Sequence, residues 1–266
     1  MKNLFSDLHH CSCYIEAVLL KIIITLFKSA ETKVLFLPLS SGKNVSKQCS
    51  HIPFPNHPQQ RFREQCNTSL LKTIMNISGT KENLYPKKIY CYRGIKRSMQ
   101  DLVKRKLFTE SLFKKKQMHP SKISDIYDGT FYKNFKDNNG KWYFEEKRNI
   151  GLILNFDFFN PFKRTKYSLG VLYAVIVNLP REERLKWENV LIIGIIPGPE
   201  EPSLTLNSFL KPFTDELLEC WNPGIKLKES DGFEYLYKFA LFCNSCDLPA
   251  IRKLLGFLSV NAKLGK

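Results

Sequence analysis

The chain has 266 residues, of which 43% are hydrophobic and 13% aromatic, so it is long and apolar enough to bury a sizeable core. Its 41 Lys and Arg residues outnumber its 25 Asp and Glu residues, which gives a formal net charge of +16. The absence of any stretch with roughly 18 uncharged apolar residues argues against a membrane span, and the scattered positions of the eight cysteines exclude a secreted disulfide scaffold.

The positive charge is concentrated in one part of the chain, because nearly all of the basic excess precedes Gly151. A basic half beside a neutral, apolar half indicates a region that binds a polyanion, joined to a packed domain, and the phosphate backbone of a nucleic acid fits such a region. A solvated, partly disordered basic surface is the alternative, and charge alone does not separate the two.

Residues 1–50 form an unassigned hydrophobic and linker segment. The run Tyr14–Phe27 is apolar but contains two charged residues, so it predicts a buried helix or strand rather than an anchor. Residues 51–149 form a basic N-terminal region that we expect to be mostly helical. Within it, a short helix is predicted over Arg61–Lys72, after three closely spaced prolines.

The segment Lys87–Lys116 carries much of the charge and predicts an amphipathic helix. Its apolar positions recur at helical spacing and are Ile95, Met99, Leu102, Val103 and Leu107. The basic outer face is a candidate for contact with DNA or RNA phosphates, through Lys96, Arg97, Lys104, Arg105, Lys106, Lys114, Lys115 and Lys116. A solvated helix face is the alternative, and the shortage of balancing acids favours polyanion contact.

Two turns precede the apolar half of the chain. One lies at Asp128-Gly129 and the other over Asp137–Lys141, and aromatic residues flank both. This pattern predicts a small lead-in that contains β-structure, in which Asp128 serves turn formation rather than catalysis.

The apolar half, residues 150–266, predicts an α/β domain. Three strand-like runs follow one another through Ile150–Pro199 with short connections, which favours an antiparallel meander. A helix is then predicted over Leu206–Trp221, kinked or shortened at Pro212. The fourth strand, Tyr235–Cys243, follows this helix and can therefore lie parallel to the first strand.

Two aspartates come at the ends of the first and fourth strands of this pattern. Asp157 closes the first run and Asp247 follows the fourth, so the topology places both carboxylates at neighbouring strand ends, where they can share a divalent cation such as Mg²⁺. A turn or capping role is the alternative for each. The nearby Cys243 and Cys246 form a lone CxxC pair, which we interpret as structural because no second ligand pair follows. All eight cysteines are expected to be reduced in an intracellular protein.

The segments NFDFFNPF, YSLGVLYAVIVNLP, IIGIIPGPEEP, LNSFLKPFTDELLECW and ALFCNSCDLPA, in this order, resemble the transposase domain of CACTA (En/Spm-type) DNA transposons. The resemblance runs from about His51 to the C-terminus. It implies an RNase H-like fold with a mixed sheet and a DDE/D-type centre, in which Asp157 is the first catalytic acid and Asp247 the second, both ligating Mg²⁺ or Mn²⁺. It also implies transposon-end DNA as the partner, a nuclear location and a possible oligomer.

One departure from the family concerns the C-terminus. The family continues beyond the LGFLSVNAKLG stretch to a cysteine-containing knuckle and a third acidic residue, whereas this sequence stops at Lys266. The resemblance therefore implies a C-terminally truncated, transposase-derived protein with an incomplete fold and a weakened or absent strand-cleaving activity. A non-catalytic DNA-binding remnant and a fragment without function of its own are the alternatives.

Overall fold

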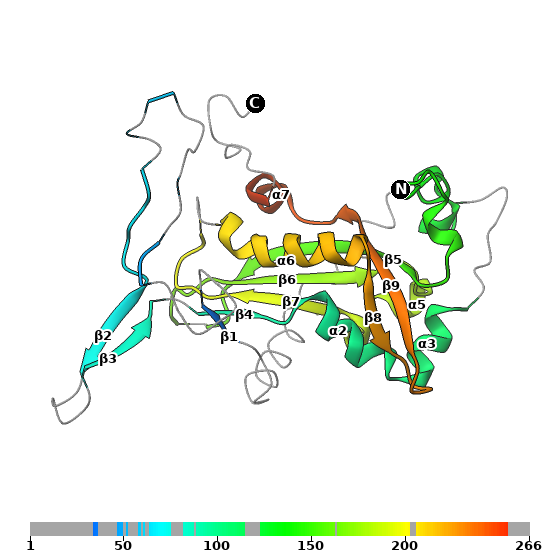
Figure 1. Ribbon diagram of the computed structural model, residues 1–266, viewed down its shortest axis with the longest axis horizontal. Coiled ribbons are helices and arrows are strands. Elements are labelled where there is room, and N and C mark those ends of the chain that lie inside the picture. The colour runs from blue at the N-terminus through cyan, green and yellow to red at the C-terminus, as the bar shows by residue number, and fades with distance from the viewer. Residues whose placement is uncertain are drawn as a thin grey trace. The chain divides into compact units, whose positions relative to one another are not determined.

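The computed structural model describes residues 34–36, 47–49, 52, 58–59, 61, 64–75, 82–87, 89–114, 123–162, 164–202 and 206–254. The chain divides into two compact units (Figure 1). The smaller unit is Lys33–Tyr92, and the larger one contains the described residues from Arg93 onward. The boundary at Tyr92 lies inside the basic region predicted over residues 51–149.

The larger unit is built on a mixed sheet whose strands lie in the order β7-β6-β5-β9-β8. Strand β5 pairs antiparallel with β6, and β6 pairs antiparallel with β7. Strand β9 pairs parallel with β5, and β8 lies antiparallel beside β9. The bounds are Asn149–Phe159 for β5, Leu169–Ile176 for β6, Leu191–Ile196 for β7, Ile225–Lys228 for β8 and Glu234–Asn244 for β9. The prediction of a mixed α/β sheet is confirmed, and β8 is an additional strand.

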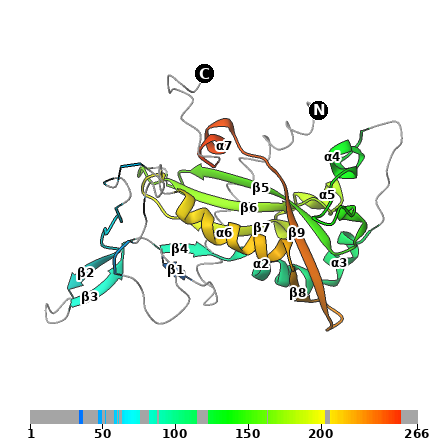
Figure 2. The ribbon, with the colours of Figure 1, turned by 45° about the horizontal axis from the view of Figure 1, so that its top comes forward.

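Helix α6 spans Leu206–Trp221, as predicted, and lies along the sheet in both views of the ribbon (Figures 1 and 2). Its buried side chains repeat at helical spacing and are Leu206, Phe209, Leu210, Phe213 and Cys220. The helix continues through Pro212. Leu218, on the outer side of the helix, is 63% exposed. Gly224, with φ of +101°, follows the helix in a conformation that favours glycine.

The single helix predicted over Lys87–Lys116 is wrong, because the segment contains a strand and two helices. Strand β4 spans Ile89–Tyr92, α2 spans Gly94–Val103 and α3 spans Lys106–Leu112. The four apolar residues predicted within α2 are buried, whereas Leu107 in α3 is 80% exposed. The break follows from Arg105, whose backbone is extended and whose guanidinium donates to the Glu188 carbonyl at 2.8 Å.

Tertiary side-chain contacts fix α2. The Glu216 carboxylate of α6 accepts the first two free N–H groups of α2, from Ile95 at 2.9 Å and Lys96 at 2.8 Å. The Gln100 side chain pairs with both backbone groups of Lys228, at 2.8 and 3.0 Å, and so occupies the free edge of β8. These contacts come from residues more than 100 positions away, so local sequence carries little signal for them.

The lead-in consists of η2 (Ile126–Asp128), α4 (Thr130–Lys133) and η3 (Tyr143–Glu145). Its only described β-pairing is the bridge between Lys136 and Trp142, so the predicted β-structure is smaller than expected. The Asp128 carboxylate accepts three hydrogen bonds from Ser124 and Asp125, which supports its assignment to turn formation. Helix α5 (Arg181–Arg184) and η4 (Trp187–Asn189) connect β6 to β7.

The smaller unit contains two strand pairs in its described residues. Strand β1 (Val34–Phe36) pairs with β4, and β2 (Leu71–Met75) pairs with β3 (Glu82–Pro86). The helix predicted over Arg61–Lys72 is wrong where the chain is described, because residues 64–70 are not helical and β2 begins at Leu71. In the described part of residues 51–149, helix therefore does not predominate. The predicted run Tyr14–Phe27 lies outside the described residues.

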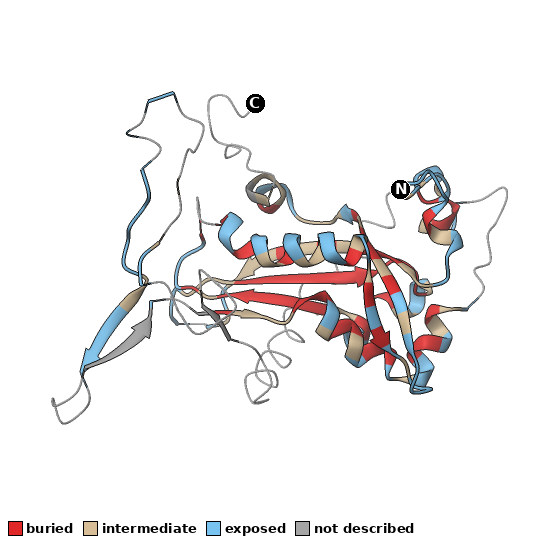
Figure 3. Cartoon of the chain, viewed as in Figure 1, coloured by how far each residue is buried: buried red, intermediate tan, exposed pale blue. Residues whose placement is uncertain are grey.

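Burial is concentrated in the central strands, as Figure 3 shows. Every residue of β7 is buried, and so is all of β6 after its first residue. Such continuous burial explains why these strands appear in the sequence as uninterrupted apolar runs. Among the described residues, no helix is long and apolar enough to cross a membrane.

Candidate functional site

The parallel pairing of β5 and β9 determines where the two predicted acids lie. The paired positions closest to the strand ends are Leu154 and Asn244. Asp157 comes three residues after Leu154, and Asp247 comes three residues after Asn244. Asp157 is still within β5, where it pairs with Val171 of β6, so this strand continues beyond the end that the sequence predicted, whereas Asp247 follows the end of β9. Counted along the two strands, both acids lie three residues beyond the last β5–β9 pair, at the same end of that pairing.

A register shift in β9 produces this equivalence. Leu152 pairs with Leu241, but the next residue of β5, Ile153, pairs with Cys243. Phe242 is therefore an extra residue in β9, as in a β-bulge. If Phe242 paired regularly with Ile153 instead, Cys246 rather than Asp247 would come to the position equivalent to Asp157.

Aromatic side chains of the lead-in surround the bulged residue. Phe242 is 8% exposed, and its ring centroid lies 4.8 Å from Phe131, 5.8 Å from Phe135 and 5.9 Å from Phe144. Tyr132 completes the set at 6.1 Å. Such ring pairs add to the free energy of burial. The lead-in, which precedes the sheet in sequence, thus packs against the residue that sets the register of β9.

Cys246 lies between the two acids. Beyond the last paired positions, Ser245 N donates to the Leu154 carbonyl at 2.8 Å, and Phe156 N donates to the Cys246 sulfur at 3.2 Å. The pKa of the Cys246 thiol is raised to about 11, chiefly by burial and in smaller part by the charges of Asp247 and Asp157. The thiol is therefore protonated at neutral pH, and both carboxylates are close enough to act on it. The interpretation of this cysteine as structural agrees with these contacts.

The two carboxylates differ in their surroundings. Asp157 is partly buried, and its Oδ1 accepts the N–H of Phe158 at 2.7 Å. Asp247 is exposed, and its Oδ1 accepts the N–H of Ala250 at 2.7 Å, so it caps α7 (Leu248–Leu254). Asp247 therefore has the helix-capping role that the sequence analysis gave as an alternative to metal binding.

The donor set fits a hard divalent cation only in part. Aspartate oxygens are suitable ligands for Mg²⁺ or Mn²⁺, and an exposed carboxylate leaves room for water and phosphate. Within the described ranges, however, no group of three or more His, Cys, Asp or Glu side chains is arranged to hold a metal ion. The arrangement can contribute two ligands, Asp157 and Asp247.

The predicted nucleic-acid-binding residues differ in their exposure. Four lysines are exposed, and they are Lys96, Lys104, Lys106 and Lys114. Arg97 is partly buried, and Arg105 bonds to Glu188 and Asn189 within the protein. Lys115 and Lys116 lie outside the described residues. A cavity of about 620 Å³ beside α3 is lined by acids as well as bases, including Glu183 and Glu188, so it is not a purely basic groove.

Sequence reasoning missed the loop between β5 and β6, which begins three residues after Asp157. It carries an exposed ring, Phe162, together with exposed Arg164 and Lys166. The signal was present in the stretch NPFKRTKY, which has three basic residues and no acid directly after the strand that bears Asp157.

Comparison with protein-family models gives a match over the second half of the chain. A family model described as "Transposase family tnp2" matches residues 120–264, a range that covers more than half of the chain and includes both aspartates. No curated protein matches the chain, and no solved structure does.

Proposed function

Because the chain belongs to the transposase family tnp2, we propose that Asp157 and Asp247 are two of the metal-binding acids of a DDE/D-type centre for DNA strand cleavage and transfer. The observation that carries this proposal is the bulged parallel register, which gives two acids far apart in sequence equivalent positions at one end of the sheet. Because of the family and the resemblance of its sequence motifs, we also propose that the domain belongs to the CACTA group and has an RNase H-like fold. Its substrate would be duplex DNA.

Each residue has a definable part in this chemistry. Asp157 and Asp247 would hold a divalent cation, Mg²⁺ or Mn²⁺, from the neighbouring strands β5 and β9 and the residues that follow β9. Such an ion, when bound, polarises the phosphodiester and lowers the pKa of a ligated water. The exposure of Asp247 keeps this side open to a DNA strand. Cys246, as a neutral thiol between the acids, adds no charge to the pair.

We further propose that cleavage requires a third carboxylate in addition to Asp157 and Asp247, as the resemblance implies. Two acids can retain affinity for a cation while failing to position the attacking and leaving oxygens together.

A second candidate is a DNA-binding protein without catalysis. The observation in its favour is the exposure of Lys96, Lys104, Lys106 and Lys114, in a chain with a net charge of +16. Both candidates act on DNA, so we propose a nuclear location for either. Salt dependence is the signature of this second candidate, because each phosphate contact releases counterions.

Metal binding and DNA nicking separate the candidates. Mn²⁺ affinity is measured by calorimetry on the wild type, on Asp157→Asn and Asp247→Asn, and on Asp215→Asn, which alters an exposed acid of α6. Nicking of supercoiled DNA is followed in parallel. We expect both site variants to lose Mn²⁺ affinity at least tenfold and the α6 variant to match the wild type. Equal affinities in all four proteins would refute the metal site and leave the DNA-binding candidate.

A further inference from the structure

The loop between β5 and β6 presents an aromatic ring to solvent shortly after the strand that carries Asp157. Phe162 is 54% exposed, five residues after Asp157. Its ring meets the ring of Tyr167 edge-on, with centroids 5.6 Å apart and an interplanar angle of 75°. A large exposed apolar side chain is common by itself, but one supported by a second ring is better suited to hold a flat ligand.

The loop is attached to the sheet at both of its ends. The Phe162 N–H donates to Oδ1 of Asn160 at 3.0 Å, which closes a turn after β5. At the other end, Ser168 N donates to the Pro199 carbonyl at 2.8 Å. Tyr167 packs closely on the chain that leaves β7, since a side chain at Gly198 would come within 3.0 Å of the tyrosine ring. The two rings are therefore supported by backbone from two strands.

The charged residues of the loop that surround the rings are all basic. Arg164 and Lys166 are exposed, and the sequence from Asn160 to Ser168 contains no acid. An acid from outside this stretch, Glu201, contacts the base of the loop, where its Oε1 accepts from the Ser168 hydroxyl at 3.4 Å. Exposed aromatic rings interspersed with cations are the pattern by which proteins bind single-stranded nucleic acid, with bases stacked on rings and phosphates held by the cations.

We propose that Phe162, supported by Tyr167, stacks on an unpaired base of a DNA strand whose phosphates contact Arg164 and Lys166, next to Asp157. This inference rests on the proposed function for the identity of the polymer. It adds a substrate form to that function: DNA that is unpaired at the reacting end, rather than an intact duplex. A cleavable phosphodiester near Asp157 would then have its neighbouring base held outside the stack.

The test measures binding in EDTA, so that metal binding and cleavage play no part. The full chain is titrated against a single-stranded oligonucleotide containing 2-aminopurine, a fork with an unpaired end, and the matched duplex. Variants are Phe162→Ala and Phe162→Trp. The control is Phe233→Ala, which removes another exposed ring, 68% accessible, whose N–H likewise bonds to a side chain two residues earlier, Oδ1 of Asp231 at 2.9 Å.

We expect Phe162→Ala to weaken binding of the single strand and the fork by roughly tenfold, with loss of 2-aminopurine quenching, while Phe162→Trp restores both. The control should bind as the wild type does, and duplex affinity should change less than twofold in all variants. Equal losses in Phe162→Ala and the control, or quenching that persists in Phe162→Ala, would overturn the proposal. Loss of Mn²⁺ binding in Asp157→Asn tests the metal site separately, so either idea can fail alone.

Discussion

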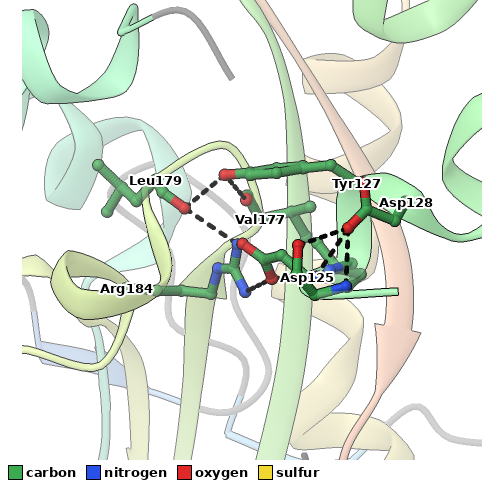
Figure 4. Close-up of polar contacts among 8 residues, drawn as sticks. Asp125, Tyr127, Asp128, Val177, Leu179 and Arg184 are labelled. Carbon is green, nitrogen blue, oxygen red and sulfur yellow. Dashed lines mark hydrogen bonds and ion pairs between the residues drawn. The ribbon is translucent and has the colours of Figure 1, made fainter. Parts of the chain in front are cut away.

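Replacement of Asp125 by Ala tests how the lead-in is held to the sheet domain. Figure 4 shows the Asp125 carboxylate facing the guanidinium of Arg184, with two bonds of 2.8 and 2.9 Å. The side chains are only 14% and 8% exposed, respectively. Arg184 also donates to the Leu179 carbonyl at 3.0 Å, and Tyr127 donates to the same carbonyl at 2.5 Å. One carboxylate thus neutralises the arginine of a buried polar network.

The size of the effect follows from burial. In Asp125→Ala the Arg184 guanidinium keeps its bond to Leu179 but loses both charge-assisted bonds, so a buried charge is left without its counterion. We expect the free energy of unfolding to fall by about 3–5 kcal/mol. The exposed pair Lys211–Asp215 has side chains 72% and 58% exposed, and its loss in Asp215→Ala should cost about 0.5 kcal/mol or less.

Urea unfolding followed by tryptophan fluorescence measures both changes. The double variant Asp125→Ala with Arg184→Met removes the stranded charge and should recover part of the loss, because an apolar side chain of similar length fills the site. If Asp125→Ala destabilised the protein no more than Asp215→Ala does, the buried pair would not anchor the lead-in as reasoned here.

Three further predictions concern single groups. Burial raises the pKa of Tyr127 to about 12. Because the unfolded chain ionises first, the contribution of Tyr127 to the free energy of unfolding is complete below pH 10 and is lost between pH 10 and 12. Urea unfolding of the wild type and of Tyr127→Phe at several pH values in this range measures how the free energy of unfolding changes with pH. Glu216→Ala leaves two N–H groups of α2 without an acceptor and should cost about 1–2 kcal/mol, measured by urea unfolding against Glu219→Ala on the same helix. The hydrogen bond from Thr68 lowers the pKa of Cys66, whereas the pKa of Cys246 is raised to about 11. Iodoacetamide at pH 7.5 should therefore label Cys66 before Cys246. Mass spectrometry that showed Cys246 labelled before Cys66 would contradict this difference in pKa.

The strands and the long helix were predictable because their own residues determine them. Continuous apolar runs specify β5, β6 and β7, and the apolar repeat specifies α6 over Leu206–Trp221. Short connections then favour antiparallel neighbours, and the intervening helix permits a parallel return. Little tertiary information is needed for these assignments.

The failures occurred where distant residues decide the local conformation. Helix α2 begins at Gly94 because Glu216 accepts its first N–H groups, and the chain breaks at Arg105 because that side chain bonds to the segment before β7. The helical periodicity across Lys87–Lys116 carries no information about either of these contacts. In the same way, the residues around Leu71 lie in a strand because β3 pairs with them.

At the site, the sequence predicted that Asp157 and Asp247 leave neighbouring strands, but not how their positions are matched. That depends on Phe242, which resembles any other apolar residue of β9 in the sequence. Its role as an unpaired residue appears only from the pairings on either side of it.

The bulge at Phe242 determines which insertions and deletions leave the two acids at matching positions. The connection from β5 to β9 includes the β8–β9 turn at Gly232, where a side chain would meet nothing within 4 Å, and residues inserted there lie far from the paired positions that precede the acids. Loss of Phe242 would only remove the bulge, because Leu241 and Cys243 already pair with consecutive residues of β5. An insertion between Cys243 and Asp247 would instead displace the second acid by one place and turn it to the other face. Lineages of this domain should therefore vary freely in length at the hairpin, tolerate loss of the bulged residue, and hardly lengthen between Cys243 and Asp247.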